Sequence, residues 1–388
     1  MRIIIILFIS LNFYCIQFSQ AQNELFQTIR GSVNDKTTLQ PLIGVSIVVT
    51  DITPFKYAIT NNEGKFTIEN VIVGRHDIKA TYVGYLPVVI NNLMIVSAKE
   101  VVLNIEMEES VETINEIVVK NELRKDMPKN TMATVSARQF TIEETNRFAG
   151  SFGDISRMVV NYAGVTAISN QRNDIIIRGN NPMGLLWKVE DIDIPNPNHF
   201  GSAGSSGGAF TIVNNNVLKN SDFFTGAFPS NYGNALSGVF DLQLRNGNNT
   251  KREYTIQAGY NGLETGFEGP ILSNSKASLL FNYRLSTLQA INSLGIKLNT
   301  LPEYQDITFK FIFPTSKGSF SIFGIGGLSS IAVLESNKPE KEWTYKQAAQ
   351  DAYVNSDMGV LGIKFKHNFN NETRGVFCLA MTIVLPIL

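Results

Sequence analysis

Hydrophobic and polar residues alternate with a two-residue period in two long parts of the chain, and this pattern predicts β-strands. Residues 27–107 contain short alternating runs separated by turn residues such as Asn34–Lys36 and Asn61–Gly64. Strand signals at intervals of about 8–12 residues are typical of an antiparallel sandwich. Between the two parts, residues 125–247 show a mixed α/β pattern.

The second alternating part, residues 248–388, contains longer strand patterns. Four apolar series recur at every second residue: Tyr254, Ile256 and Ala258; Leu279, Phe281 and Tyr283; Ile307, Phe309 and Phe311; and Leu361, Ile363 and Phe365. Apolar residues on one face, polar residues on the other and frequent aromatics are typical of transmembrane β-barrel strands. A soluble β-sandwich with one hydrated face would show the same alternation.

The N-terminus resembles an export signal. Met1-Arg2 provides a short positive start, Ile3 to Ile9 is an unbroken apolar run, and Ser19-Gln20-Ala21 offers small residues for cleavage after Ala21. A membrane-anchoring helix would need about 20 apolar residues, and Asn12 and Gln17 interrupt this run. We therefore expect residues 1–21 to be a cleaved signal peptide.

Composition argues against several classes of protein. The 388 residues carry 33 Lys+Arg and 34 Asp+Glu, a net charge of −1 that gives no electrostatic basis for binding nucleic acid. Three His and two Cys do not supply a zinc site of the Cys- or His-rich kind, and no cofactor is expected. Gly204 to Gly208 has the spelling of a nucleophile elbow, but it lies in a Gly/Ser run rather than between a strand and a helix, so we expect no enzyme.

The first alternating part carries a motif series: Gly31-x-Val33-x-Asp35, Pro41-Leu42-x-Gly44-Val45, Thr60-x3-Gly64-x-Phe66, Gly74 and Val83-Gly84-Tyr85. This series resembles the carboxypeptidase regulatory-like domain. The resemblance implies a transthyretin-like β-sandwich over residues 27–107 with no catalytic residues of its own.

A second motif series follows in residues 125–247. It includes Ile177-Arg178-Gly179-Asn180-x-Pro182 and Phe228-Pro229-x-x-Tyr232-Gly233-x-x-x-Ser237-Gly238-Val239. This series resembles the plug domain of TonB-dependent outer-membrane receptors. One departure is Glu190-Asp191, where many members of that family have an Asp-Gly turn. We expect Gly179, Gly226, Gly233 and Gly238 to adopt positive φ or to pack closely against a barrel wall.

The linker between these domains, residues 108–124, contains a β-prone hexapeptide: Ile114, Asn115, Glu116, Ile117, Val118 and Val119. An extended segment of this kind can add a strand to another protein's sheet, because pairing needs only free backbone donors and acceptors. In the receptor family the TonB box, which contacts the energy transducer TonB, lies at this position. The resemblance therefore implies that Ile114 to Val119 is a TonB box.

The expected fold class is mainly β and multidomain: a transthyretin-like sandwich, an α+β plug domain, and the first strands of an incomplete transmembrane β-barrel. Plugged transporters use about 22 strands, whereas residues 248–388 have room for roughly six at about 9–11 residues each. Residues 376–388 lose the alternation and lack a terminal aromatic. We therefore expect a chain truncated or frame-shifted near Gly375, and an open barrel edge in lipid would leave backbone groups unpaired.

The resemblance implies the N-terminal portion of an outer-membrane receptor for energised nutrient uptake. Its partners would be a TonB-type transducer, outer-membrane lipid and a nutrient ligand such as a siderophore, glycan or peptide; a surface lipoprotein is a further candidate. The alternative is a soluble periplasmic binding or interaction module without transport activity.

Overall fold

The computed structural model describes residues 25–35, 40–97, 99–107, 109, 136–140, 142–148, 150–151, 153–168, 172–201, 206–259, 262–272, 276–286, 300–333, 352–370 and 373–387. The expected signal peptide and the hexapeptide Ile114 to Val119 lie outside these residues. The chain divides into two compact units, residues 1–121 and 122–388, and each is described by itself.

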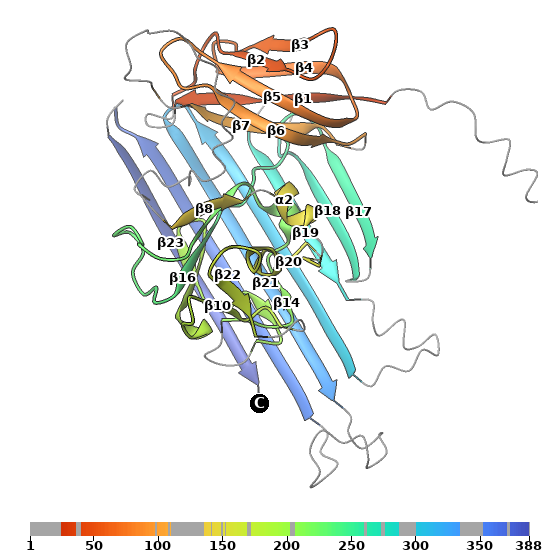
Figure 1. Cartoon of the computed structure of the whole chain (residues 1–388), viewed down its shortest axis with the longest axis vertical. Helices are drawn as coiled ribbons and strands as arrows, with labels where there is room; N and C mark the ends of the chain where they lie inside the picture. The colour runs from red at the N-terminus through yellow and green to blue at the C-terminus, as the bar shows by residue number, and fades with distance from the viewer. Residues whose placement is uncertain are drawn as a thin grey trace, which may run out of the picture. The chain divides into compact units, whose positions relative to one another are not determined.

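The first unit is a sandwich of two sheets (Figure 1). One sheet has the order β4 (Lys65–Ile72), β1 (Phe26–Asp35), β7 (Val101–Met107). The other has the order β3 (Lys56–Ile59), β2 (Ser46–Val49), β5 (Gly74–Thr81), β6 (Val88–Ile95). Alternate residues of the strands face inward and form its core, among them Ile29, Val33, Ile47, Val49, Phe66, Ile68 and Ile78.

The expectation that this sandwich is antiparallel throughout is wrong at one pair of strands. β1 and β7 run parallel, with Ile29 opposite Val101 and Asp35 opposite Met107. Parallel neighbours need a long crossover connection, and here all the intervening strands supply it. The two-residue period that predicts a strand carries no information about the direction of its neighbour.

The second unit begins with a small domain, the plug-like domain, described from residue 136 to residue 247. Its five-stranded sheet has the order β12 (Ile192–Ile194), β11 (Leu185–Val189), β16 (Gly238–Leu242), β15 (Ser221–Phe224), β8 (Ala137–Phe140). Around it lie helices α2 (Ile142–Arg147) and α3 (Ile155–Val159), the 3-10 turns η1 (Pro182–Gly184) and η2 (Asn215–Val217), and the strand pairs β9 (Val165–Ala167) with β10 (Ile175–Ile177) and β13 (Asn198–His199) with β14 (Phe210–Thr211). Trp187 stacks on Phe240 at 4.2 Å between ring centroids, at the centre of its core.

The rest of the second unit is a seven-stranded antiparallel sheet in which each strand pairs with the next along the chain. The strands are β17 (Glu253–Gly259), β18 (Gly262–Pro270), β19 (Ser278–Leu285), β20 (Thr300–Thr315), β21 (Gly318–Val333), β22 (Ala352–Asn368) and β23 (Arg374–Ile387). Within the part of the chain that the structure describes, β17 and β23 are the two edges and the sheet is not closed. The expected fold class, a β-sandwich with a plug-like domain and a partial barrel, is confirmed.

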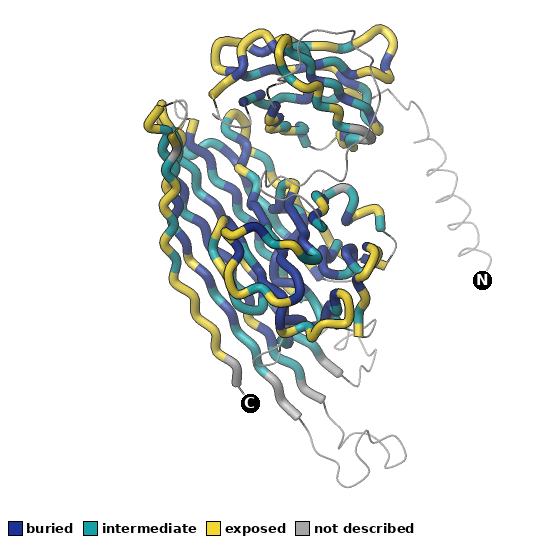
Figure 2. The backbone as a smooth tube through the Cα atoms, turned by 60° about the vertical axis from the view of Figure 1, so that its left-hand side comes forward, coloured by how far each residue is buried: buried dark blue, intermediate teal, exposed yellow. Residues whose placement is uncertain are grey.

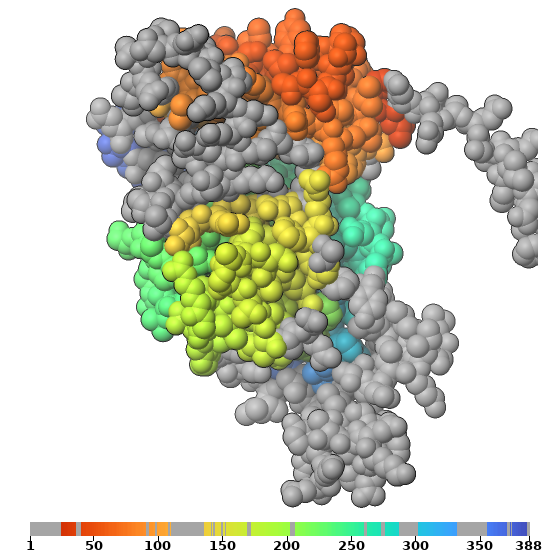
Figure 3. All heavy atoms as spheres, in the orientation of Figure 1, coloured from red at the N-terminus to blue at the C-terminus, as the bar shows by residue number. Residues whose placement is uncertain are grey.

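The two faces of this sheet differ as the alternation predicts. Thr308, Phe323 and Lys364 are buried on the inner face, against the plug-like domain. Ile307, Leu361 and Phe365 on the opposite face are 36–47% exposed. Figure 2 shows buried and exposed segments of these strands, and in Figure 3 the yellow and green atoms of the plug-like domain cover the middle of the sheet.

The C-terminal segment forms a strand although its sequence does not alternate. Residues 376–387, where the alternation is lost, belong to β23, which pairs with β22 from Arg374 opposite Asn368 to Ile387 opposite Asn355. Strand pairing uses only backbone groups, so a segment that is apolar on both faces can extend a sheet as well as an alternating one. Among the described residues, no helix combines the length and the apolar character needed to cross a membrane.

Two glycines of one motif provide a matched test of packing in the plug-like domain. A Cβ added at Gly238 would lie 2.2 Å from Ile177 Cδ1 and 2.9 Å from the carbonyl oxygen of Phe224. We expect Gly238→Ala to lower the free energy of unfolding by about 1–3 kcal/mol, as overpacking does. Gly233 has nothing within 4 Å of such a Cβ, so Gly233→Ala serves as the control.

The measurement is guanidinium unfolding followed by Trp187 fluorescence, in a Trp343→Phe background that removes the only other tryptophan. Equal stability of the two variants would mean that the core around Gly238 relaxes without cost.

Candidate functional site

The candidate site is the contact between the plug-like domain and the inner face of the seven-stranded sheet. Part of this contact is apolar: Phe323, Ile325 and Val360 of the sheet belong to the same buried cluster as Trp187 and Phe240. Glycines on the sheet let the domain approach closely, since a Cβ at Gly327 would lie 2.7 Å from Ile212 Cδ1. Set into this contact are several buried charged and polar clusters.

The first cluster is centred on the Glu190 carboxylate at the end of β11. Its Oε1 accepts from Lys310 Nζ of β20 at 2.8 Å, and its Oε2 accepts from Lys364 Nζ of β22 at 3.0 Å. Oε1 also accepts from the backbone N–H of Leu244 at 2.9 Å. Lys364 Nζ lies 2.5 Å from Asp191 Oδ2 as well, so two acidic residues on one turn face two lysines on the sheet.

The turn that presents these carboxylates has an unusual backbone. Glu190 and Asp191 have φ of 52° and 70°, the left-handed values that a two-residue hairpin turn of type I′ requires at both positions. Glycine or Asn usually occupies such positions, because other L-residues are strained there. In this chain the contacts with Lys310 and Lys364 compensate for that strain, which explains how Glu-Asp can replace the Asp-Gly of many plug domains.

These contacts control the charge of Glu190. Burial alone would raise the pKa of its carboxyl, but Lys310 and Lys364 outweigh burial and hold that pKa well below its usual range. The carboxylate is therefore ionised at neutral pH, as pairing with two ammonium groups requires.

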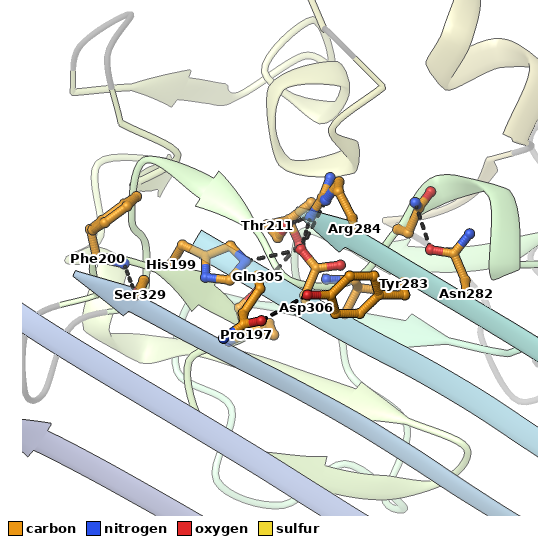
Figure 4. Close-up of polar contacts among 12 residues, drawn as sticks. Pro197, His199, Phe200, Thr211, Asn282, Tyr283, Arg284, Gln305, Asp306 and Ser329 are labelled. Carbon is orange, nitrogen blue, oxygen red and sulfur yellow. Dashed lines mark hydrogen bonds and ion pairs between the residues drawn. The ribbon is translucent and has the colours of Figure 1, made fainter. Parts of the chain in front are cut away.

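The second cluster is centred on Asp306 of β20 (Figure 4). Asp306 Oδ2 lies 3.0 Å from His199 Nε2 and accepts from Arg284 Nε at 2.8 Å. Arg284 Nη2 donates to the Thr211 carbonyl at 2.5 Å, so the guanidinium joins the sheet to the plug-like domain. Nearby, the backbone N–H of Phe200 donates to Ser329 Oγ at 3.2 Å.

His199 is fully buried in this cluster, with its ring 4.7 Å from that of Tyr304. We assign the proton to Nε2, because a carboxylate can only accept, and Nδ1 then has no partner in the described residues. A second proton on Nδ1 would place a charge where nothing accepts it. Burial accordingly lowers the pKa of His199, and the hydrogen bond to Asp306 offsets this only in part.

Two further groups of contacts cross from the domain and its exit segment to the sheet. Arg245 donates to both oxygens of Glu268 at 2.7 and 2.9 Å. Asn214 donates to Asn282 at 3.1 Å, and Asn282 and Asn216 each donate to Glu264 Oε1 at 2.8 Å.

The motif residues expected from the sequence lie at a different end of the plug-like domain. Arg178 and Gly179 form a left-handed turn with φ of 50° and 78°. The N–H of Asn180 closes this turn on the Ile177 carbonyl at 2.9 Å, and Pro182 opens the 3-10 turn η1. The structure thus gives Gly179, Asn180 and Pro182 a local role in shaping loops.

The second motif surrounds the start of β16. Tyr232 donates its hydroxyl to Asp241 Oδ2 at 2.6 Å, and the N–H of Ser237 donates to the Gly184 carbonyl at 3.0 Å. Gly238 packs closely, but against Ile177, Phe224 and Leu185 of the plug-like domain rather than against the sheet. Gly233 has no positive φ and no close neighbour, so the expectation for that glycine is wrong.

The candidate elbow does not form a nucleophile site in its described part. Ser206 Oγ donates to the Pro182 carbonyl, and the Ser206 carbonyl accepts from Trp187 Nε1 at 3.1 Å. Both groups are used to hold a loop. Across the described ranges, no group of three or more His, Cys, Asp or Glu is placed to hold a metal ion.

Sequence reasoning assigned no role to the charged residues of the sheet: Lys310, Lys364, Asp306 and Arg284. A signal was present, because Lys310, Lys364 and Arg284 each lie between two apolar residues of an alternating strand, whereas Asp306 follows the polar Gln305. A charged residue on the inner face of a barrel strand must meet either water or an opposite charge, and here it meets the plug-like domain.

Removal of the Glu190 charge tests the first cluster. We expect Glu190→Gln to lower the free energy of unfolding by about 3 kcal/mol, because it leaves two buried lysines without their main partner. The control is Asp193→Asn, which breaks the more exposed pair with Lys188 (3.1 Å) and should cost about 1 kcal/mol or less. Trp187 fluorescence during guanidinium unfolding reports both, and equal losses would contradict the assignment.

The second cluster predicts a pH dependence. The unfolded chain binds a proton at His199 below about pH 6.5, whereas the folded protein, with its lowered pKa, does not. His199 therefore contributes stability above about pH 6.5 that is lost as the pH falls toward the folded pKa, by at most about 2 kcal/mol at pH 5. The His199→Gln variant keeps a donor for Asp306, and between about pH 7.5 and pH 5 it should lose less stability than the unsubstituted protein. Equal losses in the two proteins would exclude His199 as the cause.

Comparisons with known proteins bear on both units. Residues 28–108 match the model of the carboxypeptidase regulatory-like domain. No curated protein matches the chain.

Three solved structures are similar over much of the chain. The ferric enterobactin receptor PfeA from Pseudomonas aeruginosa is 14% identical, with a TM-score of 0.44, over 66% of this chain and 42% of that one. The siderophore receptor PirA from Acinetobacter baumannii is 15% identical, with a TM-score of 0.42, over 63% and 39%. The outer membrane transporter YddB from Escherichia coli is 14% identical, with a TM-score of 0.41, over 60% and 37%.

The chain thus spans about two fifths of the length of each of these proteins. The match over residues 28–108 agrees with the motif series in that part of the chain, which resembles the same carboxypeptidase regulatory-like domain.

Proposed function

We propose that the chain is the N-terminal portion of a TonB-dependent outer-membrane receptor for energised uptake of a nutrient ligand. One observation carries this proposal: a folded domain is seated on the charged inner face of a long-stranded sheet whose other face is apolar and exposed. An exposed apolar sheet face has no use in a soluble protein, whereas the strands of a transmembrane β-barrel require an apolar face toward lipid.

The arrangement suggests a route for ligand and for force. The resemblance places the TonB box at Ile114 to Val119, before the plug-like domain in the chain. A transducer that pairs with this segment and pulls would transmit tension to the first residues of that domain. The domain would then shift against the sheet and open a path for a ligand bound on the far side.

Localisation and partners follow from the same proposal. The signal peptide would export the chain, the apolar face of the sheet would contact outer-membrane lipid, and a TonB-type protein would be the partner on the periplasmic side.

The TonB box is tested by a proline substitution. Val118→Pro removes a backbone donor from the segment that would pair with the transducer. We expect it to weaken binding of a purified periplasmic TonB domain to the full chain by about tenfold, equivalent to about 1.4 kcal/mol. Lys125→Pro, in the same part of the chain but outside the hexapeptide, should bind as the unsubstituted chain does.

Fractionation of cells that express the chain provides the second readout. The receptor proposal expects the chain in the outer-membrane fraction, released by detergent and not by high salt. A chain recovered in the soluble periplasm, with TonB binding indifferent to Val118→Pro, would overturn the proposal and favour the periplasmic module.

A further inference from the structure

The first described residue of the plug-like domain is attached in an unusual way. Ser136 has a left-handed backbone with φ of 61°, so the chain turns sharply just before β8. Its carbonyl accepts from the N–H of Thr225 at 2.8 Å, and its hydroxyl accepts from Arg178 Nη2 at 3.1 Å. A residue of the Ile-Arg-Gly motif therefore holds the point where the chain enters the domain.

The surroundings of Arg178 favour this position of its side chain. Its N–H donates to the Gly164 carbonyl at 2.8 Å, and a Cβ at Gly164 would lie 3.5 Å from Arg178 Cγ. A Cβ at Gly226 would lie 3.3 Å from Arg178 Nη1. Gly164 and Gly226 thus leave space for the aliphatic part and the guanidinium of the Arg178 side chain, which extends to Ser136.

The strand that follows Ser136 is weakly held. Among the described residues, β8 is an edge of the five-stranded sheet and pairs only with β15, over the four pairs from Ala137 opposite Phe224 to Phe140 opposite Ser221. Short edge strands are among the elements that open first in native proteins. Detachment that begins at the N-terminal end of β8 must break the contact at Ser136 before any pair of the ladder.

We propose that Arg178 is a positioning residue that fastens Ser136 and thereby sets how readily the edge strand β8 detaches from the plug-like domain. The last step rests on the proposed function. On that function, tension applied to Ile114 to Val119 reaches Ser136 before it reaches β8. Arg178 then determines the tension at which the domain begins to open, while β11 and β16 remain folded.

Hydrogen–deuterium exchange of the full chain in detergent micelles tests this role. We expect Arg178→Ala to speed exchange in residues 137–140 about fivefold, the size of effect that loss of one hydrogen bond to a charged group at a partly exposed site gives. Arg178→Lys, which keeps a charged donor, should restore part of the protection. Exchange in β11 and β16 should stay unchanged in both variants, which shows that the domain remains folded.

Two further variants separate the contact from general effects of losing an arginine. Arg172→Ala removes another arginine of the same domain, paired with Asp174, and should leave β8 unaffected. Ser136→Ala should reproduce the effect of Arg178→Ala, and the double variant should be no faster than either single one, because both remove the same interaction.

Unchanged exchange in β8 of Arg178→Ala, or effects of Ser136→Ala and Arg178→Ala that multiply in the double variant, would overturn the proposal. The readout does not depend on TonB. If the Val118→Pro test fails while β8 exchange responds to Arg178, the receptor function is wrong and the role of Arg178 stands.

Discussion

The structure of the second unit depends on the pairing of buried charges between the plug-like domain and the sheet. Lys310 of β20 and Lys364 of β22, two strands of the meander with β21 between them, point into a space without bulk water, where an unpaired ammonium would cost several kcal/mol. The Glu190 carboxylate satisfies both, and Asp191 adds a second contact to Lys364. The same carboxylate depends mainly on these two lysines to stay ionised despite its burial. The plug-like domain and the seven-stranded sheet therefore each provide the partners for the other's buried charges.

The backbone of the Glu190-Asp191 turn also depends on these ion pairs. A type I′ turn made of Glu and Asp is unfavourable in isolation, since both residues must take left-handed φ. It persists because its side chains are fixed at the sheet, 120 and 174 residues further along the chain for Lys310 and Lys364. Replacement of the usual Asp-Gly by Glu-Asp thus introduces local backbone strain, and long-range ion pairs offset that strain.

The sequence predicts the parts of this structure that depend on local pattern. Two-residue alternation identifies the strands, and it separates buried polar positions such as Lys364 from exposed apolar ones such as Leu361. Spacing of glycines identifies Gly179 and Gly238 as special, but not that Gly233 is ordinary. The pairing of Glu190 with Lys364, the parallel pair β1 and β7, and the strand β23 all depend on which distant segments become neighbours. A period along one strand does not contain that information.

The two kinds of attachment in the plug-like domain differ in what they cost to break. To separate the whole domain from the sheet would expose the apolar surface around Phe323 and Val360 and would also leave Lys310 and Lys364 unpaired. To detach β8 would break a four-residue ladder and the contacts of Ser136. A load applied at the N-terminal end of the domain meets the weaker attachment first. The distribution of contacts therefore favours local opening at the edge of the domain over its departure as a rigid body.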